Sequence, residues 1–356
     1  MTQATKRKLR IGITHGDING IGYEIILKML QDERLTELFT PIVYGSAKVA
    51  AYYRKTLNME GAPWTRINHP SEVRETEPCP YLINCTDDEL QVEIGRPTPD
   101  AGKAAYQALD QATTDLLSGD LDALVTAPIN KSTMPSSLFP YKGHTAYLGE
   151  RCGTEPLMIL TAKNTRVALV TEHLALAEVQ PALTQDLIVR KGLALRDSLV
   201  CDFGISAPRI AVLALNPHAG DNGLIGSDEK RIIAPAIARL HDDEGVLAFG
   251  PFPADGFWGS QGRSGYDAIL AMYHDQGLAP FKLLAMDEGV NFTAGLPIVR
   301  TSPDHGTGYD IAGKGLASER SLREACFLAI DIVRRRVQNE LLATNALKID
   351  GAASSR

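Results

Sequence analysis

Three histidines each stand just after an apolar segment of this 356-residue sequence. His173 ends the stretch RVALVTEH, His218 ends RIAVLALNPH, and His274 ends DAILAMYH. Such apolar runs predict buried strands, and ligands of open α/β sheets bind at the carboxyl ends of strands. Converging imidazoles would bind a divalent metal and leave coordination positions open for a substrate. His15 ends LRIGITH in the same way, and any one of these histidines taken alone fits an unrelated loop or core position equally well.

A second group of polar residues follows His274 at intervals of eight or nine residues: Lys282, Asn291 and Arg300. This spacing is too wide for one helix face, so we expect separate elements to carry them. The stretch GHTAYLGE places His144 and Thr145 at the start of a helical pattern. A helix N-terminus there would receive an anion. A plain N-cap is the alternative interpretation of Thr145.

Other motifs give weaker signals. The glycines of HGDINGIG are not in the register of a dinucleotide-binding turn, and INKST lacks the glycines of a P-loop. We interpret HGDINGIG as a tight strand-to-helix loop that lines a cleft. The stretch GPFPADGFW contains Asp255 after Pro253, and NPHAGDNGLIGSDE is a glycine-rich loop that enters a helix. Each of the last two segments is as consistent with a simple turn as with a site.

The elements that must position these groups alternate along the chain. Short apolar runs such as LRIGIT, PIVYG, LDALVTAP and PRIAVLAL are each preceded or followed by a longer helical pattern. This alternation predicts an α/β fold with largely parallel strands and helices on both faces of the sheet. A last amphipathic helix is expected from about Ser318 to Leu342.

Composition limits the class of protein. The chain is 44% hydrophobic and 22% charged, which predicts a globular protein of two domains. A net charge of -7 with scattered Lys and Arg gives no basic surface for nucleic acid or for an anionic membrane. The five cysteines are an odd number without a C-x-x-C pair, so we expect reduced thiols. The first residues lack the pattern of a signal peptide or membrane span, and a cytoplasmic protein is therefore expected.

Several long motifs together resemble one family. They are DALVTAPINK, GHTAYLGE, TEHLAL, LNPHAGDNG, GPFPAD, MYHDQGLAPFK and GVNFTAGLPIVRTSPDHGTGYDIAGKG. In this order they closely resemble the 4-hydroxythreonine-4-phosphate dehydrogenase family of pyridoxal phosphate biosynthesis, over nearly the whole chain. The resemblance implies two α/β/α domains with an interdomain cleft, similar to isocitrate and isopropylmalate dehydrogenases. It also implies a homodimer with its active site at the subunit interface. We expect residues 1–130 plus 303–345 to form the first domain, 131–302 the second, and 346–356 a flexible tail.

The resemblance also assigns roles to residues of this sequence. His173, His218 and His274 correspond to metal ligands, whereas His15 does not. The substrate-binding positions are His144, Thr145, Lys282, Asn291 and Arg300. Lys282 and Asp255 are the catalytic candidates. The implied cofactors are NAD or NADP and one divalent ion per site (Zn, Mg or Co), while the residues that contact the nucleotide stay unknown.

The implied reaction is oxidation of 4-hydroxythreonine 4-phosphate at C3, followed by decarboxylation to 3-amino-2-oxopropyl phosphate. The resemblance further implies that His173 and His218 of one subunit share a metal with His274 of the partner subunit. The first loop departs from the family pattern, because many relatives have proline where His15 stands. The subfamily is thus open: related enzymes act on phosphorylated threonate or erythronate, or on a cis-dihydrodiol dicarboxylate. A non-redox metal-dependent hydrolase or lyase is the alternative of a different class.

Overall fold

The computed structural model describes residues 7–61, 64–74, 76–87, 89–285 and 287–344, so the expected tail at 346–356 lies outside the described residues. These residues form an α/β fold around one sheet with strand order β3-β4-β2-β1-β5-β12-β11-β6-β7-β10-β8-β9. The expected fold class is confirmed. The strands are β1 Arg10–Thr14, β2 Thr40–Gly45, β3 Thr65–Ile67, β4 Tyr81–Asn84, β5 Ala123–Thr126, β6 Leu157–Ala162, β7 Thr165–Leu169, β8 Arg209–Leu213, β9 Leu247–Phe252, β10 Ala268–Ala271, β11 Val290–Ala294 and β12 Arg300–Pro303.

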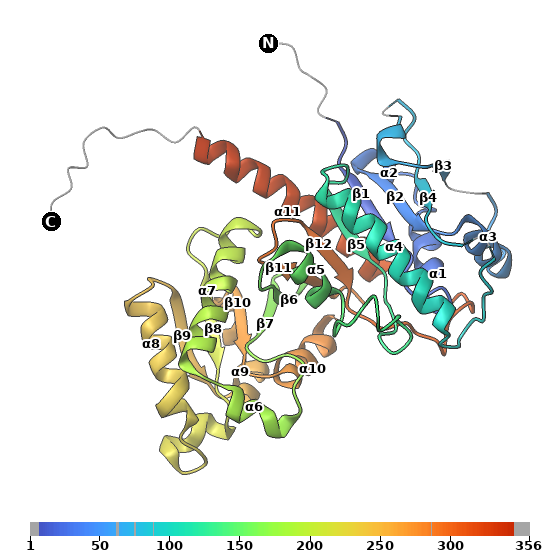
Figure 1. Ribbon diagram of the computed structural model, residues 1–356. Helices are drawn as coiled ribbons and strands as arrows, with labels where there is room; N and C mark the ends of the chain where they lie inside the picture. The colour runs from blue at the N-terminus through green and yellow to red at the C-terminus, as the bar shows by residue number, and fades with distance from the viewer. Residues whose placement is uncertain (1–6, 62–63, 75, 88, 286, 345–356) are drawn as a thin grey trace.

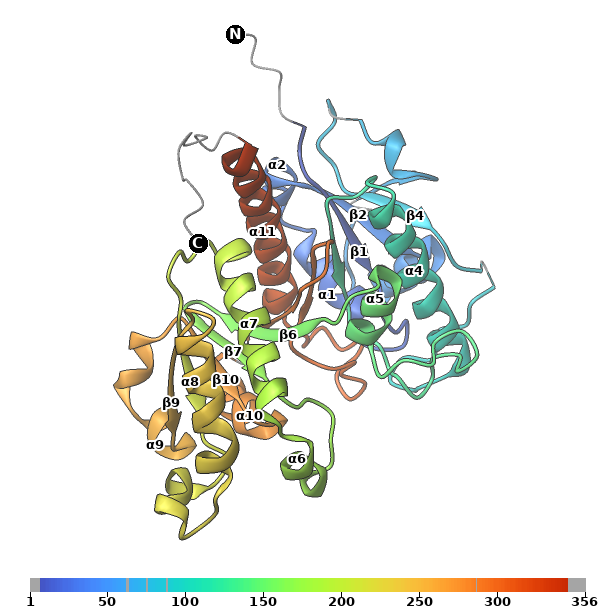
Figure 2. The ribbon, with the colours of Figure 1, turned by 60° about the vertical axis from the view of Figure 1, so that its left-hand side comes forward.

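Most neighbouring strands are parallel, as expected, but the middle of the sheet is not. Strand β11 is antiparallel to both β12 and β6, and β6 is antiparallel to β7. The strands from β3 to β12 in the sheet order therefore run opposite to those from β7 to β9. Figures 1 and 2 show these two groups as two lobes, with β6, β11 and the last helix between them.

Helices cover both faces of the sheet, and none in the described part of the chain is long and apolar enough to cross a membrane. Buried Ile11 and Ile13 of β1 share a cluster with helix α1, whereas Ile42 and Tyr44 of β2 belong to a second cluster with α4. In each pair the two residues are two positions apart, so their side chains point to the same face of the sheet. The helices are α1 Gly22–Met29, α2 Leu35–Leu38, α3 Ala47–Thr56, α4 Pro99–Leu117, α5 His144–Cys152, α6 Leu176–Ala182, α7 Gln185–Cys201, α8 Ala234–Asp242, α9 Ala254–Gly259, α10 His274–Ala285 and α11 Arg320–Thr344.

Several helix starts follow directly from local sequence. Ser46, Thr98 and Thr184 are N-caps whose side chains accept hydrogen bonds from the backbone of α3, α4 and α7. The last helix runs from Arg320 to Thr344, which confirms the expected helix to within about two residues at each end.

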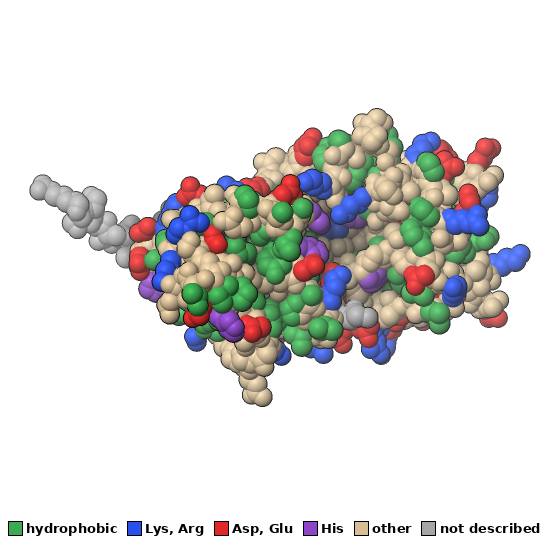
Figure 3. Space-filling view, turned by 90° about the horizontal axis from the view of Figure 1, so that it is seen from below, with side chains coloured by type: hydrophobic (Ala, Val, Ile, Leu, Met, Phe, Trp, Pro, Cys, Tyr) green, Lys and Arg blue, Asp and Glu red, His purple; other side chains and the backbone are tan. Residues whose placement is uncertain are grey.

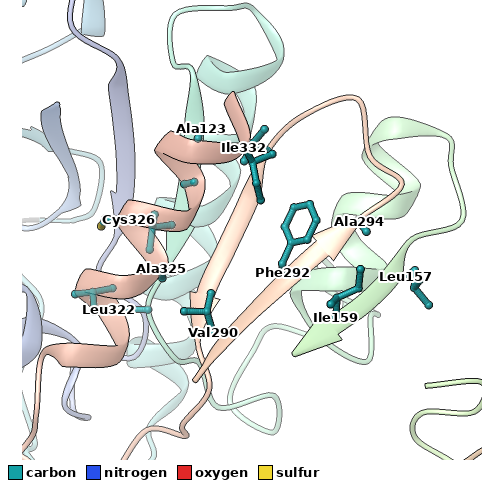
Figure 4. Close-up of a cluster of buried hydrophobic side chains, with 14 of the residues drawn as sticks. Ala123, Leu157, Ile159, Val290, Phe292, Ala294, Leu322, Ala325, Cys326 and Ile332 are labelled. Carbon is teal, nitrogen blue, oxygen red and sulfur yellow. The ribbon is translucent and has the colours of Figure 1, made fainter. Parts of the chain in front are cut away.

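The core continues through the centre of the sheet. Phe292 and Val290 of β11 pack with Ile159 of β6, while α11 adds Leu322 and Cys326 from one side (Figure 4). One apolar cluster therefore reaches from β1 to β8, and the division of the chain into two domains stays a prediction.

Candidate active site

A cavity of about 590 Å³ lies between the ends of β5 and β12, the start of α5 and helix α10. Figure 3 shows His, Lys and Arg side chains gathered around a hollow in the middle of one face of the molecule. All of the substrate-binding residues expected from the sequence line this one cavity: His144, Thr145, Lys282, Asn291 and Arg300. Two strands, β11 and β12, and two helices, α5 and α10, thus bring these groups together.

Arg300 is a buried cation in the wall of the cavity. It is 2% exposed, and its Nε and Nη1 donate hydrogen bonds to the hydroxyls of Thr126 (3.1 Å) and Thr293 (3.0 Å). Burial lowers the pKa of Arg300 to about 9. Its hydrogen-bond partners are neutral, so the cost of burying the charge is not offset by a carboxylate among the described residues. An oxyanion in the cavity would supply that compensation and accept two parallel bonds.

The N-terminus of α5 opens on the same cavity. Gly143 is the N-cap residue, with a φ of 151°, so the interpretation of Thr145 as the N-cap is wrong. A side chain at Gly143 would be strained at this φ and would bring a Cβ within 3.2 Å of Lys131 Cε. His144 and Thr145 instead occupy the first turn, where backbone N–H groups lack helical partners and attract anions.

His144 is held in its neutral form by this setting. Burial lowers its pKa well below the usual range, and the nearby cations Arg300 and Lys131 lower it further. Its Nε2 is buried without a hydrogen-bond partner in the described part of the chain, and the same is true of Asn291 Oδ1. Both atoms belong to residues that line the cavity, where a bound ligand or a water would supply the missing partner.

Some lining residues escaped the sequence analysis. Lys282 Nζ lies 3.6 Å from Asp304 Oδ1, and burial raises the pKa of Asp304 while Lys282 opposes that rise. Asp304 and His305 directly follow β12, so the polar pair after a buried strand was the signal that could have identified them. Further lining residues are Lys131, Lys142 and Glu172.

The metal-ligand candidates lie at a shared edge of the second lobe. Strands β7, β10 and β8 are neighbours and parallel, which confirms that the three segments before His173, His274 and His218 end at one edge. The rings of His173 and His274 have centroids 5.9 Å apart in one chain. No group of three or more His, Cys, Asp or Glu among the described residues is arranged to hold a metal. The role of the three histidines as ligands stays a prediction.

Hydrogen bonds hold the strand ends at this edge in place. Thr171 Oγ1 donates to the carbonyl of Met272 at 2.7 Å, which ties the chain after β7 to the chain after β10. The side chain of Gln276 accepts from Met272 N at 2.8 Å and donates to the carbonyl of Ala214 at 2.6 Å, which ties β10 to β8. The edge is therefore a fixed platform for the residues that follow.

His218 itself lies in an unusual segment. Residues 218–222 all have positive φ, with 53° at His218. The left-handed region is costly for residues other than glycine, so the surrounding structure must enforce it. The buried carboxylate of Glu229 accepts the backbone N–H of Leu215 (3.0 Å) and of Asn216 (2.7 Å) and so holds the start of this segment.

Two other expected features lie outside the cavity. Asp255 is exposed in the first turn of α9 and does not line it, so its catalytic role stays a prediction. The loop HGDINGIG does not line it either, and that expectation is wrong for this cavity. His15 is 0% exposed and stacks on Tyr23 with ring centroids 5.2 Å apart, and burial lowers its pKa to about 4. This loop is packed in the interior of the first lobe.

The fold and cavity define an α/β protein with a cavity whose lining includes four Lys and Arg side chains. The model of the family described as pyridoxal phosphate biosynthetic protein PdxA matches residues 37–329, and the chain belongs to this family. A 4-hydroxythreonine-4-phosphate dehydrogenase of Bacteroides thetaiotaomicron is 53% identical over 345 residues, covering 96% of this chain and 94% of that protein.

Solved structures agree with this assignment. The 4-hydroxythreonine-4-phosphate dehydrogenase of Klebsiella pneumoniae has a TM-score of 0.79 at 35% identity, covering 93% of this chain and 99% of that one. A terephthalate 1,2-cis-dihydrodiol dehydrogenase of Burkholderia xenovorans has a TM-score of 0.59 at 26% identity, covering 91% and 98%.

Proposed function

We propose that this chain is a dehydrogenase that oxidises 4-hydroxythreonine 4-phosphate at C3 with NAD or NADP, and that the product loses carbon dioxide to give 3-amino-2-oxopropyl phosphate. The reaction belongs to pyridoxal phosphate biosynthesis. The names of the relatives support the dehydrogenase class and the phosphorylated substrate. The observation that carries the proposal is the buried side chain of Arg300. Its hydrogen bonds within the described residues go to neutral threonine hydroxyls, and it lines a cavity that also contains Lys282 and the start of α5.

The charges of the cavity match such a substrate. Its phosphate and carboxylate are anions, and the lining residues include Lys131, Lys142, Lys282 and Arg300 in a chain whose net charge is -7. Charge-assisted hydrogen bonds to these groups would fix the substrate at both ends. Lys282 has two proposed roles, substrate binding and catalysis, and its ion pair with Asp304 orients the ammonium group.

A divalent ion is part of the proposal. The imidazoles of His173, His218 and His274 fit the donor chemistry of zinc or cobalt, and the strands that precede them are neighbours in the sheet. When bound, such an ion acts as a Lewis acid that favours loss of the C3 hydroxyl proton, and the nicotinamide accepts the hydride. We further propose a homodimer in which His173 and His218 act together with His274 of the partner subunit. The division into two domains and a cytoplasmic location complete this proposal.

Two related substrates compete with the proposed one. A relative from Oceanobacillus iheyensis, 39% identical over 331 residues, carries a provisional name as a D-threonate 4-phosphate dehydrogenase. The Burkholderia xenovorans protein is named as a dehydrogenase of a cis-dihydrodiol of terephthalate. A cationic cavity accommodates the carboxylates of either compound as well.

A direct assay tests the proposal. Purified protein with zinc, magnesium or cobalt is mixed with NAD or NADP and with 4-hydroxythreonine 4-phosphate, D-threonate 4-phosphate, D-erythronate 4-phosphate or the dihydrodiol. The reaction is measured by the absorbance of the reduced nicotinamide and by the release of carbon dioxide. We expect the highest kcat/KM with 4-hydroxythreonine 4-phosphate. A higher kcat/KM with another compound would move the chain to that subfamily. Product formation without nicotinamide reduction would indicate the hydrolase or lyase class.

A further inference from the structure

His305 lines the cavity and has a defined tautomer. Its Nδ1 lies 3.1 Å from the carbonyl oxygen of Gly306, the next residue. Because a carbonyl oxygen only accepts hydrogen bonds, Nδ1 carries the hydrogen in this contact, and Nε2 of the neutral ring retains its lone pair. The ring therefore presents an acceptor, not a donor, from its second nitrogen.

That acceptor has no partner within the described residues. His305 Nε2 is buried and makes no hydrogen bond there, and the same holds for His144 Nε2 and Asn291 Oδ1. These three atoms belong to residues that line one cavity, and two of the residues stand at the family's substrate-binding positions. Buried polar atoms without a partner are rare in folded proteins, and a ligand is a common source of the missing bond. His305 thus has the same feature as two substrate-binding candidates.

The surroundings keep His305 neutral and select what it can contact. Burial lowers the pKa of His305, the Gly306 carbonyl raises it, and the cation of Lys282 lowers it. The charged groups that line the cavity are Lys131, Lys142, Glu172, Lys282, Arg300 and Asp304, and the other lining imidazoles are His144 and His173. A lone pair cannot bind a phosphate or a carboxylate, which the four cations match instead. The ammonium group of the substrate is better matched by the Glu172 carboxylate, so the C3 hydroxyl is the donor that remains for His305.

We propose that Nε2 of His305 accepts the hydrogen bond of the C3 hydroxyl and removes its proton during oxidation. This inference rests on the proposed function. In this step the O–H bond breaks and its proton moves to Nε2, while the C3–H bond breaks and its electron pair moves with the hydrogen to the nicotinamide. The C3–O bond becomes a carbonyl, and the imidazolium later returns its proton to water. His305 is then a catalytic residue that directly follows β12 and lines the same cavity as Lys282.

Binding without nicotinamide tests the contact. The affinities of 4-hydroxythreonine 4-phosphate and of O-phosphohomoserine, the same molecule without the C3 hydroxyl, are measured by calorimetry on wild type and on His305→Ala. We expect His305→Ala to weaken binding of the hydroxyl compound about tenfold and to change binding of O-phosphohomoserine less than about twofold. Equal weakening of both compounds, or of neither, overturns the assignment.

Kinetics test the proton transfer. His305→Gln keeps a hydrogen-bond acceptor but no base, so we expect nearly normal KM and a kcat lower by about 100- to 10,000-fold. The decline of kcat on the acidic side of the wild-type profile should vanish in this variant. His241→Gln, at an exposed position on α8, is the matched control and should behave as wild type. If wild type reduces nicotinamide and His305→Gln does so equally fast, only the role of His305 fails. If wild type itself does not act on the substrate, the proposed function fails.

Discussion

The anion-binding cavity and the histidine edge of the second lobe differ in how much one chain completes. In the cavity, a single chain brings all five expected substrate-binding residues together and buries Arg300 among them. At the edge, the strands before His173, His274 and His218 are neighbours, but no three-ligand group forms among the described residues. The difference indicates that the fold of one chain completes the cavity, whereas the metal site depends on something further, which we propose to be a second subunit.

The largest expected effect comes from replacing a histidine of the edge, in two single variants that are then combined in one heterodimer. His173→Ala and His274→Ala should each be nearly inactive, because each variant damages both sites of its homodimer. Mixed heterodimers should contain one site lacking two ligands and one complete site, and activity should approach half of wild type per heterodimer. The measurement is steady-state activity after subunit exchange, with heterodimer formation verified by mass spectrometry. No recovery in verified heterodimers would assign all three histidines to one chain.

Removal of the metal should separate the two regions. Treatment with a chelator should abolish nearly all dehydrogenase activity, and addition of zinc, magnesium or cobalt should restore it. The affinity of the cavity for inorganic phosphate, measured by calorimetry, should change by less than about fivefold. The cations that bind phosphate there are Lys and Arg side chains, which the chelator does not remove. Loss of phosphate binding together with activity would mean that the edge and the cavity form one inseparable site.

Arg300→Ala tests the cavity by itself. The substitution should weaken substrate binding by about 1.5–3 kcal/mol, the range for charge-assisted hydrogen bonds, which is roughly a 10- to 150-fold loss in kcat/KM. The melting temperature should change little, because the variant also removes a buried charge whose hydrogen-bond partners are neutral hydroxyls. Arg209→Ala, on the N-terminal residue of β8 and outside the cavity, is a control. An unchanged kcat/KM would remove Arg300 from the substrate site.

The smallest effect is expected from one hydrogen bond of the edge. Thr171→Val removes the bond to the Met272 carbonyl, which still accepts the backbone N–H of residue 171 at 3.2 Å. We expect the free energy of unfolding to fall by about 1 kcal/mol, measured by urea denaturation. Thr114→Val, at an exposed helix position, should cost less. If the two variants are equally stable, the hydrogen bond from Thr171 to the Met272 carbonyl does not contribute measurably to the stability of the edge.

The helices and strands themselves, but not their order in the sheet, follow from local patterns in the sequence. Alternating strands and helices were predictable because buried parallel strands are apolar throughout, and Ser46, Thr98 and Thr184 are recognisable as helix caps. The antiparallel strands β6 and β11 were not predicted, because strand direction depends on connections and not on composition.

The site was predictable where a resemblance supplied residue roles and unpredictable where only geometry decides. Spacing alone did not separate His15 from the other histidines; the structure buries His15 against Tyr23, because the first strand enters the interior of its lobe. Asp304 was missed because its ion pair with Lys282 depends on how the end of β12 lies against α10, and His305 because its place in the cavity wall depends on the same packing.

Helix α10 joins the two regions, since it begins at His274 and has Lys282 in its last turn. Eight residues of helix correspond to an axial rise of roughly 12 Å. This rise exceeds the distance over which physiological salt screens charges in solvent, about 8 Å. A charge held at the first turn of α10 therefore has little influence, through water, on an ammonium at its last turn. Added salt weakens the part of this influence that passes through solvent, whereas burial, and after it the cations Lys131 and Lys142 of the cavity, still lower the pKa of His173.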